Sequence, residues 1–419
     1  MNKFEQRIST PRVAGSSPAG IANKNPYISK TFSGFAAAKL HQATSTFADQ
    51  SVSLSANVAP NPRENPRVDS ALRNTRERGV PGAPATVAIE TAAFRKPRLL
   101  ALDLLRGLAA LMVAIGHTAA VIPEYFGPAY SMCVAFFFLL SGYVLSHAYG
   151  EAIANGRMSL AQFIVARLAR LYPLHLLTWA ATFAVLVHQG VANSDWLLTP
   201  AALENITLTP SLFTGTFSFN APAWSIGAEF WSGILFFALC SRRPRLRAAA
   251  IGLALILFAA CELRDGFLVQ FRERYGICLG LFLLGWCLFK LRPSISPLTG
   301  WLAAAAGFAL SLFPPFPLQH HALADLPYYV VFAIAIAGLA DVPLRGIAAR
   351  IAEFSGDISF GVYLWHWPFL MVMHPKTPAE LAAFLALVMS TATTSLRYFE
   401  RPAQSLVRNI ASAWLDGPA

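Results

Sequence analysis

Four ionisable side chains stand inside strongly apolar stretches of the sequence: Arg106, His117, Glu229 and His366. Charge within an apolar span is costly, so such residues indicate function. Arg106 and His117 are eleven positions apart. On a helix that spacing puts them about 20° from a common face and ~16 Å apart along the axis. A histidine and a carboxylate are the residue types of general acid–base catalysis, so the set predicts an acid–base site. The structural alternative is that Arg106 extends to the membrane interface and that His117 is a packing residue.

Glu229 and His117 match in depth within their predicted spans. Glu229 follows Pro222, the first residue of its span, by seven positions, and His117 precedes the last residue of its own span by five. A carboxylate at this depth can orient the imidazole and stabilise its protonated form. Ser225 shares a helical face with Glu229. The alternative is that Glu229 pairs with an arginine for a structural reason alone.

His366 stands in the run Tyr363-Leu364-Trp365-His366-Trp367-Pro368. An imidazole within a span can relay protons or bind a substrate, and it can also be a packing residue. We take His366 and Tyr363, together with Ser225 and Trp224, as candidates for acceptor binding or proton relay.

Arg167 and Arg170 lie three residues apart, just before the predicted third span, and Tyr172 follows them. This spacing puts both guanidinium groups on one helical face, which suits phosphate recognition. Anchoring of the helix at the cytoplasmic interface is the alternative. With Arg106, these residues fit a donor that has a phosphate-rich head and a long thin arm ending near His117. Acyl-CoA is such a molecule.

The elements that position these residues are apolar helices. Of the 419 residues 55% are hydrophobic and 13% are charged, and the mean hydropathy is +0.48. Soluble domains carry about 25% charged residues. The composition therefore predicts an all-α, polytopic integral membrane protein. We place about ten transmembrane helices at residues 101–122, 130–149, 171–190, 222–240, 247–262, 275–291, 298–315, 326–341, 358–374 and 378–397.

The distribution of Lys and Arg orients these spans. With the N-terminus in the cytoplasm, seventeen Lys and Arg residues from Arg95 onward fall on cytoplasmic segments and four on outside loops. This bias predicts that both termini are cytoplasmic. The net charge of +11 is therefore explained by the membrane, and we expect no nucleic-acid partner. The five cysteines form no Cys-x-x-Cys pair, so no disulfide or metal site is predicted.

Three regions follow from the composition. Residues 1–94 are rich in Ser, Pro and Ala without a sustained period, which predicts a disordered cytoplasmic segment, or in part an over-extended start. Residues 95–403 form the transmembrane domain, and residues 404–419 a short cytoplasmic tail. The sequence does not specify an oligomeric state.

Taken in order, these motifs resemble those of the membrane-bound acyltransferase-3 family, the polysaccharide O-acyltransferases, over about residues 99–403. The matching elements are Arg106-x10-His117, Phe136-Phe137-Phe138-Leu139-Leu140-Ser141-Gly142-Tyr143, Arg167-x-x-Arg170-x-Tyr172-Pro173, Trp224-Ser225-x-x-x-Glu229, Tyr363-Leu364-x-His366-x-Pro368 and Glu400-x-Pro402.

The resemblance implies an O-acyltransferase of a bacterial inner membrane. The donor would be acetyl-CoA, used as a co-substrate with no bound cofactor. The acceptor would be a surface or secreted carbohydrate or a glycolipid. It implies a catalytic role for His117, with Glu229 and Arg106 beside it, and donor binding by Arg106, Arg167, Arg170 and Tyr172. His117 would act as general base, and an acyl-imidazole intermediate is the variant mechanism. A polytopic transporter or flippase of a glycolipid remains the alternative, because buried charges also line transport paths.

Overall fold

Each of the ten predicted spans overlaps a helix in the computed structural model, which describes residues 96–118, 128–210, 212–213, 219–264, 271–313 and 323–415. These residues belong to one structural unit, Lys96–Ala419. Residues 1–94, for which disorder is predicted, lie outside the described part. The helices are α4 (Leu100–Thr118), α5 (Met132–Ala154), α6 (Leu160–His188), α7 (Pro200–Ile206), α8 (Trp224–Cys240), α9 (Pro244–Arg264), α10 (Phe271–Leu291), α11 (Pro297–Leu312), α12 (Leu326–Leu339), α13 (Gly346–Met373), α14 (Pro378–Ser395) and α15 (Arg401–Leu415).

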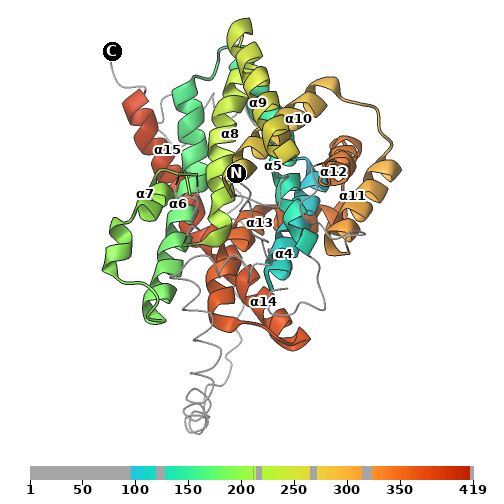
Figure 1. Cartoon of the computed structure of the whole chain (residues 1–419). Helices are drawn as coiled ribbons and strands as arrows, with labels where there is room; N and C mark the ends of the chain where they lie inside the picture. Colours follow the sequence, from blue (N-terminus) through green and yellow to red (C-terminus); the bar gives the residue numbers. More distant parts are fainter. Residues whose placement is uncertain are drawn as a thin grey trace, which may run out of the picture. The chain divides into compact units, whose positions relative to one another are not determined.

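Short helical turns join several of the helices that Figure 1 labels. Three are 3₁₀ turns, and one is a π-helical turn between α14 and α15. They are η1 (Pro128–Ser131), η2 (Ser194–Leu198), η3 (Ala221–Ala223) and the π-turn η4 (Leu396–Glu400).

Seven helical stretches in the described part are long and apolar enough to cross a membrane: Leu100–Thr118, Met132–Ala154, Leu160–His188, Ala221–Cys240, Pro244–Arg264, Arg274–Leu291 and Pro378–Ala411. Helices α11 and α12 are apolar but shorter, with 16 and 14 residues. Helix α13 has 28 residues, but it carries Glu353, Asp357 and His366, which lower its hydropathy. The prediction of an all-helical multi-pass membrane protein is confirmed for the described residues. The number ten and the cytoplasmic termini stay predictions.

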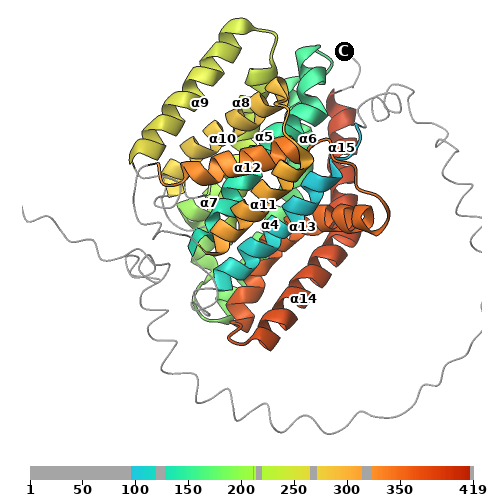
Figure 2. The same cartoon turned by 90° about the vertical axis from the view of Figure 1, so that its right-hand side faces the viewer.

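Glycines lie at the contacts of the two helix pairs that pack most extensively, α4 with α13 and α5 with α10. A Cβ atom on Gly107 of α4 would meet Ser355 of α13, and one on Gly142 of α5 would meet the backbone of Phe282 in α10. Lipid gives little hydrophobic force between helices, so small residues that allow close backbone approach stabilise such pairs. In Figure 2, α9 and α14 lie at opposite margins of the assembly, with α4, α5 and α13 between them.

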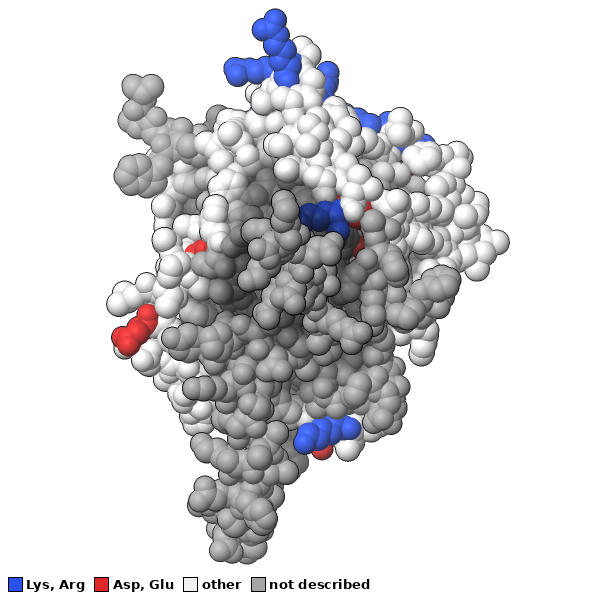
Figure 3. All heavy atoms as spheres, viewed as in Figure 1, with Lys and Arg blue, Asp and Glu red and all other residues white. Residues whose placement is uncertain are grey.

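Positive charge gathers at the turn between α8 and α9. Figure 3 shows Lys and Arg side chains clustered at the top of the view, over this turn. Arg242, Arg243, Arg245 and Arg247 are all exposed there. A cluster of this kind beside two apolar helices is typical of a cytoplasmic loop.

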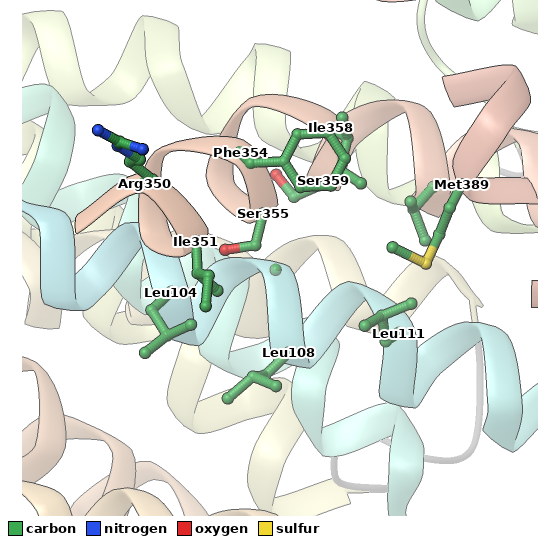
Figure 4. Close-up of a pocket in the computed structure, with 12 residues that line it drawn as sticks. Leu104, Leu108, Leu111, Arg350, Ile351, Phe354, Ser355, Ile358, Ser359 and Met389 are labelled. Carbon is green, nitrogen blue, oxygen red and sulfur yellow. The ribbon is translucent and has the colours of Figure 1, made fainter. Parts of the chain in front are cut away.

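An apolar groove of about 380 Å³ runs along α4 and α13 towards Met389 of α14 (Figure 4). Leu108 and Phe354 in its wall are 42% and 46% exposed. Exposed apolar side chains on a membrane helix are expected to face hydrocarbon. Leu108 and Phe354 are therefore expected to face lipid, whereas Arg350, Ser355 and Ser359 add polar groups to the lining of the same groove.

Candidate active site

His117 lies near the C-terminal end of α4, among aromatic rings. Its Nδ1 atom is 2.8 Å from the carbonyl oxygen of Val113, one turn earlier in the helix. Ring centroids of Tyr130, His366 and Trp367 lie 5.0, 4.9 and 5.5 Å from that of His117. A carbonyl oxygen only accepts hydrogen bonds, so Nδ1 of His117 carries the proton. In the neutral ring, Nε2 then has the free lone pair.

His366 of α13 is fully buried and contacts His117 directly. Its Nε2 atom lies 3.2 Å from Nδ1 of His117, and its own Nδ1 is 3.3 Å from the carbonyl oxygen of Val362. By the same argument, Nδ1 of His366 donates to Val362, and its Nε2 is an acceptor. The N–H of His117 is therefore shared between Val113 and His366. This arrangement fixes the tautomer and the orientation of the His117 ring.

Pro368 interrupts the hydrogen-bond ladder of α13 next to His366. Proline has no N–H, so the carbonyl four residues earlier, that of Leu364, loses its helical partner. The side-chain amide of Asn220 donates to this carbonyl at 3.1 Å. Asn220 is fully buried and directly precedes η3, which leads into α8. The bond thus links the chain before α8 to the segment of α13 that carries His366.

Ser225 and Tyr363 meet beside the histidine pair. Their hydroxyl oxygens are 2.7 Å apart, and both lie within hydrogen-bond distance of the carbonyl oxygen of Pro222. The ring of Tyr363 is 6.0 Å from that of His366. The structure therefore brings two of the predicted acceptor or relay residues together with His366. Trp224, the fourth member of this set, is buried and packs on Phe138 instead.

Arg274 of α10 is an interior charge that the sequence reasoning did not select. Its guanidinium lies over the ring of Trp224, 5.1 Å from the centroid. Its charge also acts on His117 and Tyr130. In the sequence, Arg274 stands at the boundary of an apolar run, where it is one of the four cations that the predicted topology places on outside loops. Its position one residue before Tyr275 and the apolar run is the only signal the sequence offers.

At the other end of α4, Arg106 contacts three polar groups, two of them in α13 and one, Asp103, in α4 itself. It donates to Ser359 Oγ at 3.1 Å and to the carbonyl oxygen of Gly356 at 2.8 Å, and it forms an ion pair of 2.9 Å with Asp103. Ser359 and His366 are seven residues apart, which is about two helical turns. Arg106 and His117 therefore both contact α13, as the prediction of a shared face requires.

Just before α4, Arg98 extends this polar contact. It forms ion pairs with Asp103 at 2.9 Å and with Asp357 of α13 at 3.0 Å. Burial opposes the charge of Arg98, but the two carboxylates outweigh it and raise the pKa of the guanidinium above its usual value. Arg98 is therefore a fixed cation that ties the start of α4 to α13.

Arg167 and Glu229 form an ion pair between α6 and α8. Arg167 is 7% exposed, and its Nε atom has no hydrogen-bond partner among the described residues. The expected contact of Glu229 with His117 is not the one found. His366 occupies the position at Nδ1 of His117 that the sequence reasoning assigned to the carboxylate. The equal depth of Glu229 and His117 in their spans does not determine which helices face each other.

Arg170 lies on the same face of α6, with its guanidinium 5.2 Å from the ring centroid of Phe360 in α13. The charges of Arg106, Arg167, Glu229 and Glu400 all act on it. Arg106, Arg167 and Arg170 therefore lie in one cluster, and their role in donor binding stays a prediction. Helix α6 begins at Leu160, eleven residues before the predicted span. The two arginines of α6 thus lie inside the helix and not at its end.

Tyr172 does not join this cluster through its hydroxyl group. That group donates to the carbonyl oxygen of Ile206 at 2.9 Å, and Nε2 of His175 lies 2.9 Å from the carbonyl oxygen of Asn205. Both carbonyls belong to the last turn of α7, whose carbonyls have no partner within the helix. The hydroxyl group of Tyr172 therefore has a structural role at the end of α7. Donor binding by Tyr172 stays a prediction.

Fold and site therefore define a helical membrane protein with a pair of contacting histidines, one of them fully buried, and a cluster of arginines. A family model described as an acyltransferase domain matches residues 99–396. Protein 2 in picA locus of Rhizobium radiobacter is 32% identical over 187 residues, which cover 39% of this chain and 96% of that protein. Acyltransferase MdmB of Streptomyces mycarofaciens is 27% identical over 294 residues, 60% of this chain and 71% of its own. No solved structure matches.

The matched region spans well over half of the chain and contains His117, His366 and the arginine cluster. The chain therefore belongs to the acyltransferase-3 family and is an acyltransferase enzyme.

Proposed function

We propose that the protein transfers an acetyl group from acetyl-CoA to a hydroxyl group of a surface or secreted carbohydrate, in the inner membrane of a bacterium. His117 is the general base of this reaction. The observation that carries the proposal is the hydrogen bond between Nδ1 of His117 and Nε2 of His366. It leaves Nε2 of His117 as the basic atom and keeps the ring in one orientation.

In the transfer step, Nε2 of His117 removes the proton from the acceptor hydroxyl group. The hydroxyl oxygen attacks the thioester carbonyl carbon, and the carbon–sulfur bond breaks as the ester forms. The CoA thiolate leaves and takes up the proton from His117. General base catalysis of this kind contributes about 10²–10⁴-fold to the rate. Arg274, whose charge acts on His117, would stabilise negative charge on the attacked carbonyl oxygen.

The arginine cluster supports acyl-CoA as the donor. Arg106 lies about 16 Å from His117 along the axis of α4, given eleven residues at 1.5 Å each. Guanidinium groups of Arg106, Arg167 and Arg170 suit the phosphates of a nucleotide. The pantetheine arm would extend from this cluster along the α4–α13 seam to the histidine pair.

A comparison of cell-surface glycans with and without the protein tests this proposal. We expect a mass difference of one acetyl group per modified sugar, and loss of that difference in a His117→Ala variant that still inserts into the membrane. His188→Ala, at the exposed end of α6, is the matched control and should retain transfer. Full transfer by His117→Ala, or unchanged glycans without the protein, would overturn the proposal.

A further inference from the structure

Glu400 ends the π-helical turn η4, which joins α14 to α15. A π-turn is rare and occurs frequently at functional sites. Pro402 follows two residues later and cannot donate to the carbonyl of Tyr398, which favours a widened turn here. The effect on exposure is large: Glu400 is 2% exposed, whereas Tyr398 is 70% exposed. The turn therefore directs this one carboxylate into the protein.

The two oxygens of Glu400 differ in their surroundings. Oε1 accepts a hydrogen bond of 2.8 Å from Ser395 Oγ. Oε2 is buried and has no hydrogen-bond partner among the described residues. A buried carboxylate is costly unless a cation offsets its charge. The turn η4 packs against α6, which carries Arg170. The positive charges of Arg170 and Arg401 both act on Glu400, although neither donates a hydrogen bond to it among the described residues.

Arg401 is already engaged elsewhere, which leaves Arg170 as the counter-ion. Arg401 is exposed and forms an ion pair of 3.1 Å with Asp357 of α13. Arg170, in contrast, is repelled by the like charges of Arg106 and Arg167 in the same cluster. Glu229, the other carboxylate that acts on Arg170, is paired with Arg167.

We propose that Glu400 is a positioning residue, which holds the guanidinium of Arg170 in the donor site against the repulsion of its two neighbouring arginines. The inference rests on the proposed use of acyl-CoA. Without the carboxylate, the flexible Arg170 side chain would move away from Arg106 and Arg167. Only the guanidinium groups of Arg106 and Arg167 would then remain in position to bind the phosphates of the donor.

Glu400→Gln tests this role, because it removes the charge and keeps the shape. We expect the KM for acetyl-CoA to rise roughly tenfold with kcat unchanged, the pattern of a lost binding contribution. Glu400→Asp restores the charge and should recover part of the loss. Glu353→Gln, an exposed carboxylate of α13, is the matched control and should behave as the wild type.

Binding of CoA alone, measured by isothermal titration calorimetry, separates this inference from the catalytic proposal. Weaker CoA binding by Glu400→Gln supports the positioning role even if His117→Ala retains transfer. Equal KM and equal CoA affinity in Glu400→Gln and wild type would overturn it. So would a loss of kcat and thermal stability at constant KM, because that result indicates a structural role only.

Discussion

Replacing His366 by leucine removes the nitrogen that lies 3.2 Å from Nδ1 of His117. The N–H of His117 keeps Val113 as its only acceptor, and the ring loses the contact that fixes it against α13. Because the N–H keeps this acceptor, the loss is that of an ordinary hydrogen bond, about 0.5–1.5 kcal/mol. If this cost falls on the reactive geometry, kcat falls by about 2- to 13-fold, at 1.36 kcal/mol for each factor of ten.

Transfer of radiolabelled acetyl groups by the protein in lipid nanodiscs measures this effect. His366→Gln is the conservative variant, because its amide oxygen can accept from His117, and it should recover part of the rate. His175→Gln is the control for a buried histidine outside the site, since His175 contacts Asn205 in α7. We expect its kcat to match the wild type.

Two results would refute this reasoning. Wild-type kcat in His366→Leu would show that the contact does not orient His117. A loss as large as that of His117→Ala, with no recovery in His366→Gln, would show that His366 is itself a proton-transfer group. The size of the loss and the glutamine variant therefore separate a positioning role from a catalytic one.

The remaining predictions concern stability, measured as the free energy of unfolding in mixed micelles. Arg167→Met and Glu229→Gln each leave a partly or fully buried charge without its ion-pair partner. The double variant should therefore lose less free energy of unfolding than the sum of the two single variants, with a coupling of about 1–3 kcal/mol. Additive losses would show that the pair is not coupled. Gly142→Leu should destabilise by about 1–3 kcal/mol, because its Cβ would meet the backbone of Phe282. Gly252→Leu, in open space on α9, is its control, and equal losses in both would contradict the packing argument.

Helix positions and shared faces could be predicted from the sequence because they depend on local periodicity. All ten apolar runs overlap helices among the described residues, and Arg106 and His117 both contact one neighbouring helix, as their spacing predicts. The identity of that neighbour could not be predicted. Two helices in sequence order have no fixed angular relation, and packing at Gly107 and Ser355 settles which faces meet.

The partner of Glu229 shows the same limit. Its depth matched that of His117, but depth measures only one coordinate, and the carboxylate faces Arg167 of α6. The extent of α6 was misjudged for a related reason. Arg167 and Arg170 look like the end of an apolar span in the sequence, whereas in the structure other charges compensate them inside the helix. Arg274 was overlooked because a single arginine beside an apolar run carries no periodic signal.

The α4–α13 pair is held at two distant points, by Arg106 with Ser359 and Gly356 at one end and by His117 with His366 at the other. Because both points lie on continuous helices, the separation between them is set by helical rise and cannot adapt to the ligand. Such a pair keeps a fixed distance between the phosphate-binding end and the histidine end of the site. We expect it to select acyl donors by the length of the arm between their phosphates and their thioester, so that a truncated thioester without the nucleotide reaches only one of the two points.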